Sequence, residues 1–242
     1  MTISDKLEIA KLVVSIFGFG GTIAALYFGF RQYRRSEQWK KSEFVAKEIK
    51  EFESDPVIRN ALLMIDWGSR RVNLFLKTDP SKDDLIKITR ETQCWALLPH
   101  TIEIDYLPGE ANPSEVEGVS RRNFMGKFTP IEARIRDTYD IFLDRLERFA
   151  NFIKSGLVDA EEFRPYLIYW TDSITNGTDH PGDVAWQCAL LTYINYYNYP
   201  GVQYLFARFG KDITPDGKVY QKKKELMGDR ALSDKLYQSV RR

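Results

Sequence analysis

Residues 12–30 of the chain read LVVSIFGFGGTIAALYFGF, a stretch of nineteen residues without a charged side chain. As an α-helix it is roughly 28 Å long, close to the ~30 Å hydrocarbon core of a bilayer. A buried core helix is the alternative, but a run this long and apolar on all sides favours a transmembrane helix from Leu12 to Phe30. A cleaved signal peptide usually has a shorter apolar region, and no small-residue cleavage site precedes the basic cluster that follows.

Basic residues are unevenly divided between the two ends of this stretch. Lys6 and Lys11 precede it, whereas Arg31, Arg34, Arg35, Lys40 and Lys41 follow it. Because cytosolic flanks carry the excess of Lys and Arg, we expect a single-pass membrane protein, with residues 1–11 as a short external tail and the C-terminal part in the cytosol. Aromatic side chains also gather at such interfaces, so the predicted membrane-interface set is Arg31, Tyr33, Arg34, Arg35, Trp39, Lys40 and Lys41.

Small residues recur at steps of three and four along the same stretch. They are Ser15, Gly18, Gly21, Thr22, Ala25 and Gly29. Such a face lets two helix backbones approach closely in lipid, which predicts a homo-oligomer that assembles through the helix. The alternative is that glycine is simply more frequent in membrane helices.

The charge of the whole chain is nearly balanced. Thirty-five basic residues stand against thirty-four acidic ones, a net charge of +1. Nucleic-acid binding usually requires a basic excess, so overall charge predicts no specific nucleic-acid partner. Cys94 and Cys188 are far apart and without partners at metal-ligand spacing, which indicates neither a zinc site nor a disulfide framework.

The remaining chain reads as mainly α, with at most two short strands. Residues 31–54 are predicted to form a helical stalk, 55–210 a helical cytosolic domain, and 211–242 a polar tail or terminal helix. Asp55-Pro56 starts a helix that runs to Trp67, Thr129 and Glu132 form a capping box before a helix that ends at Gly156, and further helices are expected at 84–98, 159–170, 183–197 and 202–209. Alternating patterns favour short strands at 72–77 and 102–106, with helical turns as the alternative, and Pro99–Phe128 is the longest weakly patterned stretch.

No motif predicts an enzyme, a metal site or a cofactor. The chain has two histidines, His100 and His180, and only His180 has nearby carboxylates, Asp179 and Asp183. A chemical role for His180 would need a further partner supplied by folding, and a loop histidine beside proline is usually structural or solvated. Gly18-Phe19-Gly20-Gly21 lacks the lysine and the preceding strand of a phosphate-binding loop.

A tyrosine-rich region offers a candidate ligand pocket. Its members are Tyr193, Tyr196, Tyr197 and Tyr204, with Arg208 as a nearby cation and His180 as a further candidate. Aromatic faces can stack nucleotide bases. The alternative, which we favour because basic residues are sparse there, is an aromatic core with its rim.

The layout resembles a group of uncharacterised bacterial single-pass membrane proteins. The resemblance rests on RQYRRSEQWKK at 31–41 directly after the apolar stretch, and on FLDRLERFANFIKSGLVDAEEFRPYL at 142–167. Some of these proteins are membrane effectors or accessories of antiviral defence systems, which implies a self-associating, membrane-perturbing or pore-forming role. The alternative function is a cytosolic-facing sensor or scaffold that binds a nucleotide or a protein partner.

Overall fold

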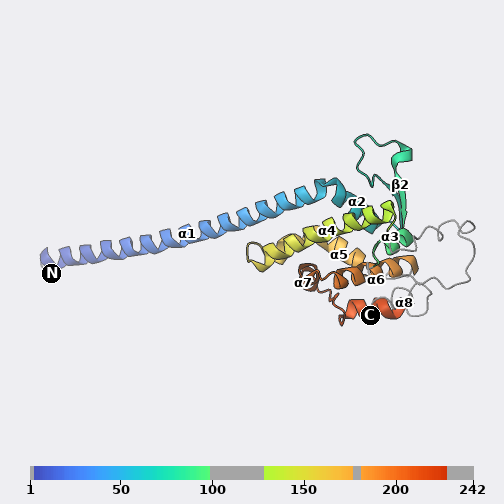
Figure 1. Cartoon of the computed structure of the whole chain (residues 1–242). Helices are drawn as coiled ribbons and strands as arrows, with labels where there is room; N and C mark the ends of the chain where they lie inside the picture. Colours follow the sequence, from blue (N-terminus) through green and yellow to red (C-terminus); the bar gives the residue numbers. More distant parts are fainter. Residues whose placement is uncertain (1–2, 99–127, 177–180, 228–242) are drawn as a thin grey trace, which may run out of the picture. The chain divides into compact units, whose positions relative to one another are not determined.

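A computed structural model describes residues 3–98, 128–176 and 181–227, without the side chains of 3–18, 20, 24, 181 and 182. These residues form a mainly helical chain with one two-stranded sheet, as the sequence predicts (Figure 1). The chain divides into two units, residues 1–47 and 48–242.

The first helix, α1 (Ile3–Ser54), is one unbroken helix of 52 residues (Figure 1). No proline interrupts it, so the hydrogen-bond ladder continues from the apolar stretch into the predicted stalk. It also includes most of the predicted external tail. It ends at the predicted residue, because Asp55 becomes the N-cap of α2 (Pro56–Asp66) and accepts a hydrogen bond from the backbone N–H of Val57 at 2.8 Å.

The small sheet pairs β1 (Ser69–Val72) with β2 (Ile86–Thr89) in antiparallel fashion, Arg71 standing opposite Lys87. The strand predicted at 72–77 is therefore wrong beyond its first residue. Asn73 exchanges two hydrogen bonds with the backbone of Lys77, at 2.8 and 3.0 Å, and this closes a turn. Leu76 takes a left-handed φ of 54° inside it. The strand predicted at 102–106 lies outside the described residues.

The helix predicted at 84–98 is correct only in its second half. A short helical turn, η1 (Lys82–Asp84), leads into β2, and α3 (Arg90–Ala96) follows. The side chain of Thr89 accepts from the backbone N–H of Thr92 at 3.2 Å and caps α3. Residues that the local sequence assigns to a helix thus form a strand instead. Pairing with β1 satisfies their backbone, and the strand places Ile88 in the buried core.

Helix α4 (Pro130–Lys154) forms the centre of the second unit. The predicted capping box is confirmed: Thr129 Oγ accepts from the N–H of Glu132, and the Glu132 carboxylate accepts from the N–H of Thr129. Its buried face packs against α2, α3 and α7 (Pro200–Arg208). The ring of Phe149 stacks on Phe163 of α5 (Ala160–Thr175) at 4.8 Å, so α5 closes over the same core.

Helix α6 (Pro181–Tyr196) is buried from Val184 to Ile194 and packs against α3, α5 and α8 (Lys218–Met227). An apolar helix without a solvent face needs neighbours on all sides. The region predicted as a polar tail or terminal helix supplies one of them, since it contains α8, Ile213 and Tyr220 are buried, and the Tyr220 hydroxyl lies 3.0 Å from Thr192 Oγ. Residues 211–227 therefore belong to the packed unit, while 228–242 lie outside the described residues.

Candidate functional site

Large apolar side chains are exposed along α1 between Phe19 and Phe30. Phe19, Ile23 and Leu26 are 71%, 53% and 68% exposed, and the same holds for Tyr27, Phe28 and Phe30. At 100° per residue most of these positions lie on one broad face of the helix, Phe28 lies apart from them, and the small-residue face lies in between. Water-soluble proteins seldom leave so continuous an apolar surface uncovered, so this part of α1 is a candidate interaction site.

Among the residues that the structure describes, no helix carries a stretch long and apolar enough to cross a membrane. The predicted transmembrane helix lies partly outside that description, because the side chains of residues 12–18, 20 and 24 do not belong to it. The span from Leu12 to Phe30 therefore stays a prediction.

The predicted interface residues follow the apolar stretch directly, and most are exposed. Arg31, Arg34 and Arg35 lie within two turns of the helix, and Arg34 places its guanidinium carbon 4.6 Å from the centroid of the Phe30 ring. Lys40 forms an exposed ion pair with Glu37 at 3.4 Å. Tyr33 and Trp39 are 62% and 67% exposed, and Lys41 is half-buried.

The described part of the small-residue face is open. Gly21, Thr22, Ala25 and Gly29 are exposed, and a Cβ added at Gly21 or Gly29 would meet no atom within 4 Å. The surroundings of Ser15 and Gly18, the other two members of this face, are not among those that the structure describes. Among the described residues, then, nothing packs against Gly21 or Gly29, and a second helix has room to approach.

The structure splits the tyrosine-rich region between core and surface. The Tyr193 ring is 1% exposed and packs against Tyr197 at 4.6 Å, whereas Tyr196 is 41% exposed. Tyr204 lies on α7, where its hydroxyl accepts a hydrogen bond from Arg208 Nε at 3.0 Å. A buried Tyr193 cannot offer its face to a base, so the predicted residues do not form one shared stacking surface. His180 lies outside the described residues.

A carboxylate of α4, that of Asp140, accepts hydrogen bonds from two tyrosines. The hydroxyls of Tyr193 and Tyr199 both donate to Asp140 Oδ1, the latter at 2.9 Å. Burial and the nearby Asp140 carboxylate raise the pKa of both phenols, so both remain protonated donors. The pKa of Asp144 is also raised. The largest cause is partial desolvation of its carboxylate, and the second is repulsion from the carboxylates of Asp140 and Glu147.

Arg136 is a buried cation that sequence reasoning missed. It is 5% exposed and donates to the carbonyl oxygens of Ala96 and Leu98 at 3.0 and 2.7 Å. Its guanidinium carbon also lies 4.7 Å from the Tyr193 ring and 4.8 Å from the Phe128 ring. The arginine therefore caps the end of α3 and is enclosed by aromatic faces, a structural role.

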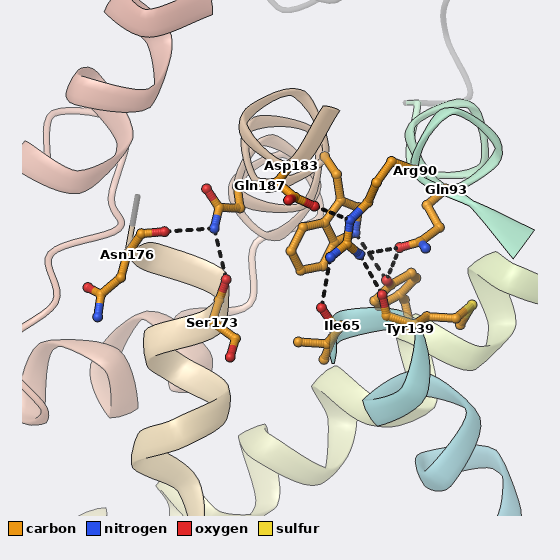
Figure 2. A network of polar contacts seen from close by, with 10 residues as sticks. Ile65, Arg90, Gln93, Tyr139, Ser173, Asn176, Asp183 and Gln187 are labelled. Atoms are coloured by element: carbon orange, nitrogen blue, oxygen red, sulfur yellow. Dashed lines mark hydrogen bonds and ion pairs between the residues drawn. The ribbon is translucent and has the colours of Figure 1, made fainter. Parts of the chain in front are cut away.

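A second arginine, Arg90, joins three helices (Figure 2). Its Nε donates to Asp183 Oδ1 of α6 at 2.6 Å, and its Nη atoms donate to the carbonyl oxygens of Met64 and Ile65 at the end of α2. The guanidinium carbon lies 3.9 Å above the Trp186 ring. Asp183, predicted as a companion of His180, is thus occupied by an arginine.

The Arg90 network continues into the core through Gln93, Tyr139 and Trp186 (Figure 2). Trp186 Nε1 donates to the Tyr139 hydroxyl at 3.1 Å, and that hydroxyl donates to Gln93 Oε1 at 2.7 Å. Burial raises the pKa of the Tyr139 hydroxyl, which keeps it a donor. These hydrogen bonds hold α3, α4 and α6 together, so the groups form a structural network, although Gln93 Nε2 is buried without a hydrogen-bond partner among the described residues.

Asn176 is a second polar hub, at the end of α5. Gln187 Nε2 donates to the carbonyl oxygens of Ser173 and Asn176, both at 2.8 Å (Figure 2). Lys223 of α8 donates to the same Asn176 carbonyl at 3.2 Å, and Lys211 donates to Asn176 Oδ1 at 2.8 Å. Burial lowers the pKa of Lys223. The hub ties α8 to α5 and α6.

Within residues 3–98, 128–176 and 181–227, no three His, Cys, Asp or Glu side chains group so that they could bind a metal ion. The polar clusters in this part of the chain hold helices together, and they leave the exposed part of α1 as the candidate functional site.

Comparison with known proteins adds no assignment. No family model matches the chain, and neither a curated protein nor a solved structure matches it.

Proposed function

We propose that the chain is a membrane-anchored, self-associating helical protein of the bacterial inner membrane. The observation that supports this most directly is the belt of exposed apolar side chains from Phe19 to Phe30 on one unbroken helix. A bilayer removes such side chains from water on all sides of a helix, and the helix satisfies its own backbone hydrogen bonds there. The uncharged run Leu12–Phe30 has the length that this requires.

The basic residues that follow the belt support the orientation with residues 1–11 outside and the helical domain in the cytosol. In this arrangement α1 leaves the membrane as a stalk, and its last residues, from Glu48 to Ser54, belong to the packed unit. The proposed role is to hold that domain at the membrane surface. Perturbation of the membrane, as an effector or accessory of antiviral defence, is the further role that the resemblance implies.

Membrane integration and orientation can be tested together with single introduced cysteines. Ser4→Cys should react with a membrane-impermeant maleimide in intact spheroplasts, whereas Ser36→Cys should react only after lysis. Both variants should stay in the membrane pellet after alkaline carbonate extraction. The native cysteines give little background, because Cys94 and Cys188 are buried and burial raises the pKa of the Cys94 thiol to about 12.

The unmodified chain is the control for this labelling. Recovery of both variants in the carbonate supernatant would refute the anchor. The reversed labelling pattern would refute the orientation alone.

Self-association through the small-residue face is a separate prediction. The triple variant Gly21→Leu, Ala25→Leu, Gly29→Leu should shift the detergent-solubilised protein from oligomer to monomer, because leucine side chains would hold the backbones apart. Size-exclusion chromatography with light scattering measures the mass of the protein in the complex. Because self-association depends on the protein concentration within the detergent micelles, dissociation should be clearest at low protein-to-detergent ratio.

A matched control places the same number of leucines on the opposite side of the helix. Phe19→Leu, Ile23→Leu, Phe30→Leu keeps the segment apolar and leaves the glycines unchanged, so the oligomer should persist. If both triple variants retain the mass of the unmodified protein, the small face is not the contact. A separate measurement, dye release from vesicles that contain the unmodified protein, tests whether the protein perturbs the bilayer.

A further inference from the structure

We infer that Arg31, Arg34 and Arg35 form a binding site for anionic phospholipid headgroups at the cytosolic surface of the membrane. This inference rests on the proposed anchor and names the lipid class that it selects. The three guanidinium groups are exposed and follow the last apolar residue of the stretch, Phe30.

The first argument is depth. Measured along the helix axis from Phe30, Arg31 to Arg35 lie about 2–8 Å beyond the apolar stretch, since each residue adds 1.5 Å. The headgroup layer on each side of a bilayer is roughly 5–8 Å thick. Lys40 and Lys41 lie about 15 Å beyond Phe30, outside that layer. The arginines, not the lysines, are therefore level with the lipid phosphates.

The second argument is direction. Side chains on an α-helix lean toward its N-terminus, so arginines that follow an apolar segment point back toward the bilayer surface. Arg34 shows this lean, with its guanidinium 4.6 Å from the Phe30 ring one turn earlier. The arginines that follow the segment therefore lean toward the lipid phosphates.

The third argument is charge. Among the described residues, Arg31 and Arg35 have no carboxylate partner, whereas Lys40 is paired with Glu37. A guanidinium binds phosphate oxygens through two parallel N–H donors. Zwitterionic headgroups carry their own cation beside the phosphate. Anionic headgroups do not, and the unpaired arginines complement them.

The test uses the full chain reconstituted in vesicles of equimolar phosphatidylglycerol and phosphatidylcholine, then extracted with a disc-forming polymer. Mass spectrometry of the co-extracted lipid should show phosphatidylglycerol enriched at least about threefold over the vesicle composition, since each arginine at an anionic surface favours contact by roughly fivefold. The triple variant Arg31→Gln, Arg34→Gln, Arg35→Gln should return the ratio close to that of the vesicle.

The matched control, Lys40→Gln, Lys41→Gln, Lys47→Gln, removes the same charge from the same helix and should keep the enrichment. Equal enrichment in the arginine variant and the unmodified protein would overturn the inference, as would loss of enrichment in the lysine control. If the unmodified protein enters the vesicles but its co-extracted lipid has the vesicle composition, the lipid site is overturned and the anchor is not. Failure of the unmodified chain to enter vesicles of either lipid overturns the anchor as well.

Discussion

Replacement of Arg90 by methionine is expected to lower the free energy of unfolding by about 3 kcal/mol. Methionine fills similar space but cannot donate to Asp183 or to the carbonyl oxygens of Met64 and Ile65. These acceptors would stay largely buried without their donor, because the Arg90 side chain is only 11% exposed and that of Asp183 is 23% exposed. Thermal unfolding in mild detergent should show a melting temperature lower by roughly 6–12 °C.

An exposed arginine provides the control for this substitution. Arg59→Met on α2 removes the same charge from the surface and should change stability by no more than about 0.5 kcal/mol. A double variant with Asp183→Asn should lose less stability than the sum of the two single variants, because each single change already breaks the same ion pair. Additive effects would show that Arg90 and Asp183 do not act as a pair.

Substitution of Ile23 by aspartate is expected to displace the protein from the membrane. Ile23 lies near the middle of Leu12–Phe30 and its side chain is exposed. A carboxylate at that depth costs about 3 kcal/mol of apparent insertion free energy, which is roughly a hundredfold in the insertion equilibrium. Aspartate is too short to extend its charge to the interface. The fraction of protein in the carbonate-resistant pellet measures the effect.

Leu226→Asp is the matched control for Ile23→Asp. Like Ile23, Leu226 has an exposed branched aliphatic side chain, which is 49% exposed. It lies on α8 in the packed unit. Its replacement should leave the pelleted fraction unchanged. If Ile23→Asp also leaves that fraction unchanged, the apolar belt of α1 is not what holds the protein at the membrane.

Some boundaries of the fold could be predicted because their signals are local. Asp55-Pro56 separates α1 from α2, and Thr129 with Glu132 starts α4, each through groups only a few residues apart. The absence of proline and glycine from Arg31 to Ser54 likewise predicts the continuous stalk. These signals act within one turn of the chain and need no tertiary contact.

The errors fall where a distant partner decides the outcome. Residues Ile86–Thr89 were expected in a helix, and they form a strand because Ser69–Val72 pairs with them. Residues 211–242 are predicted as a polar tail or terminal helix; α8 is that helix, but the sequence does not predict that Tyr220 and Lys223 pack, which Thr192 and Asn176 decide by forming hydrogen bonds with them. A local pattern cannot anticipate a hydrogen bond to another helix.

The candidate site shows the same division. By itself the sequence determines the uncharged stretch Leu12–Phe30, the basic residues after it and the helices that local caps delimit. Only the tertiary structure decides that Arg90 and Arg136 are buried, because a buried cation needs carbonyls, carboxylates and rings from several other helices at fixed positions. It also decides that Tyr193 is part of the core, where Asp140 and Arg136 enclose it.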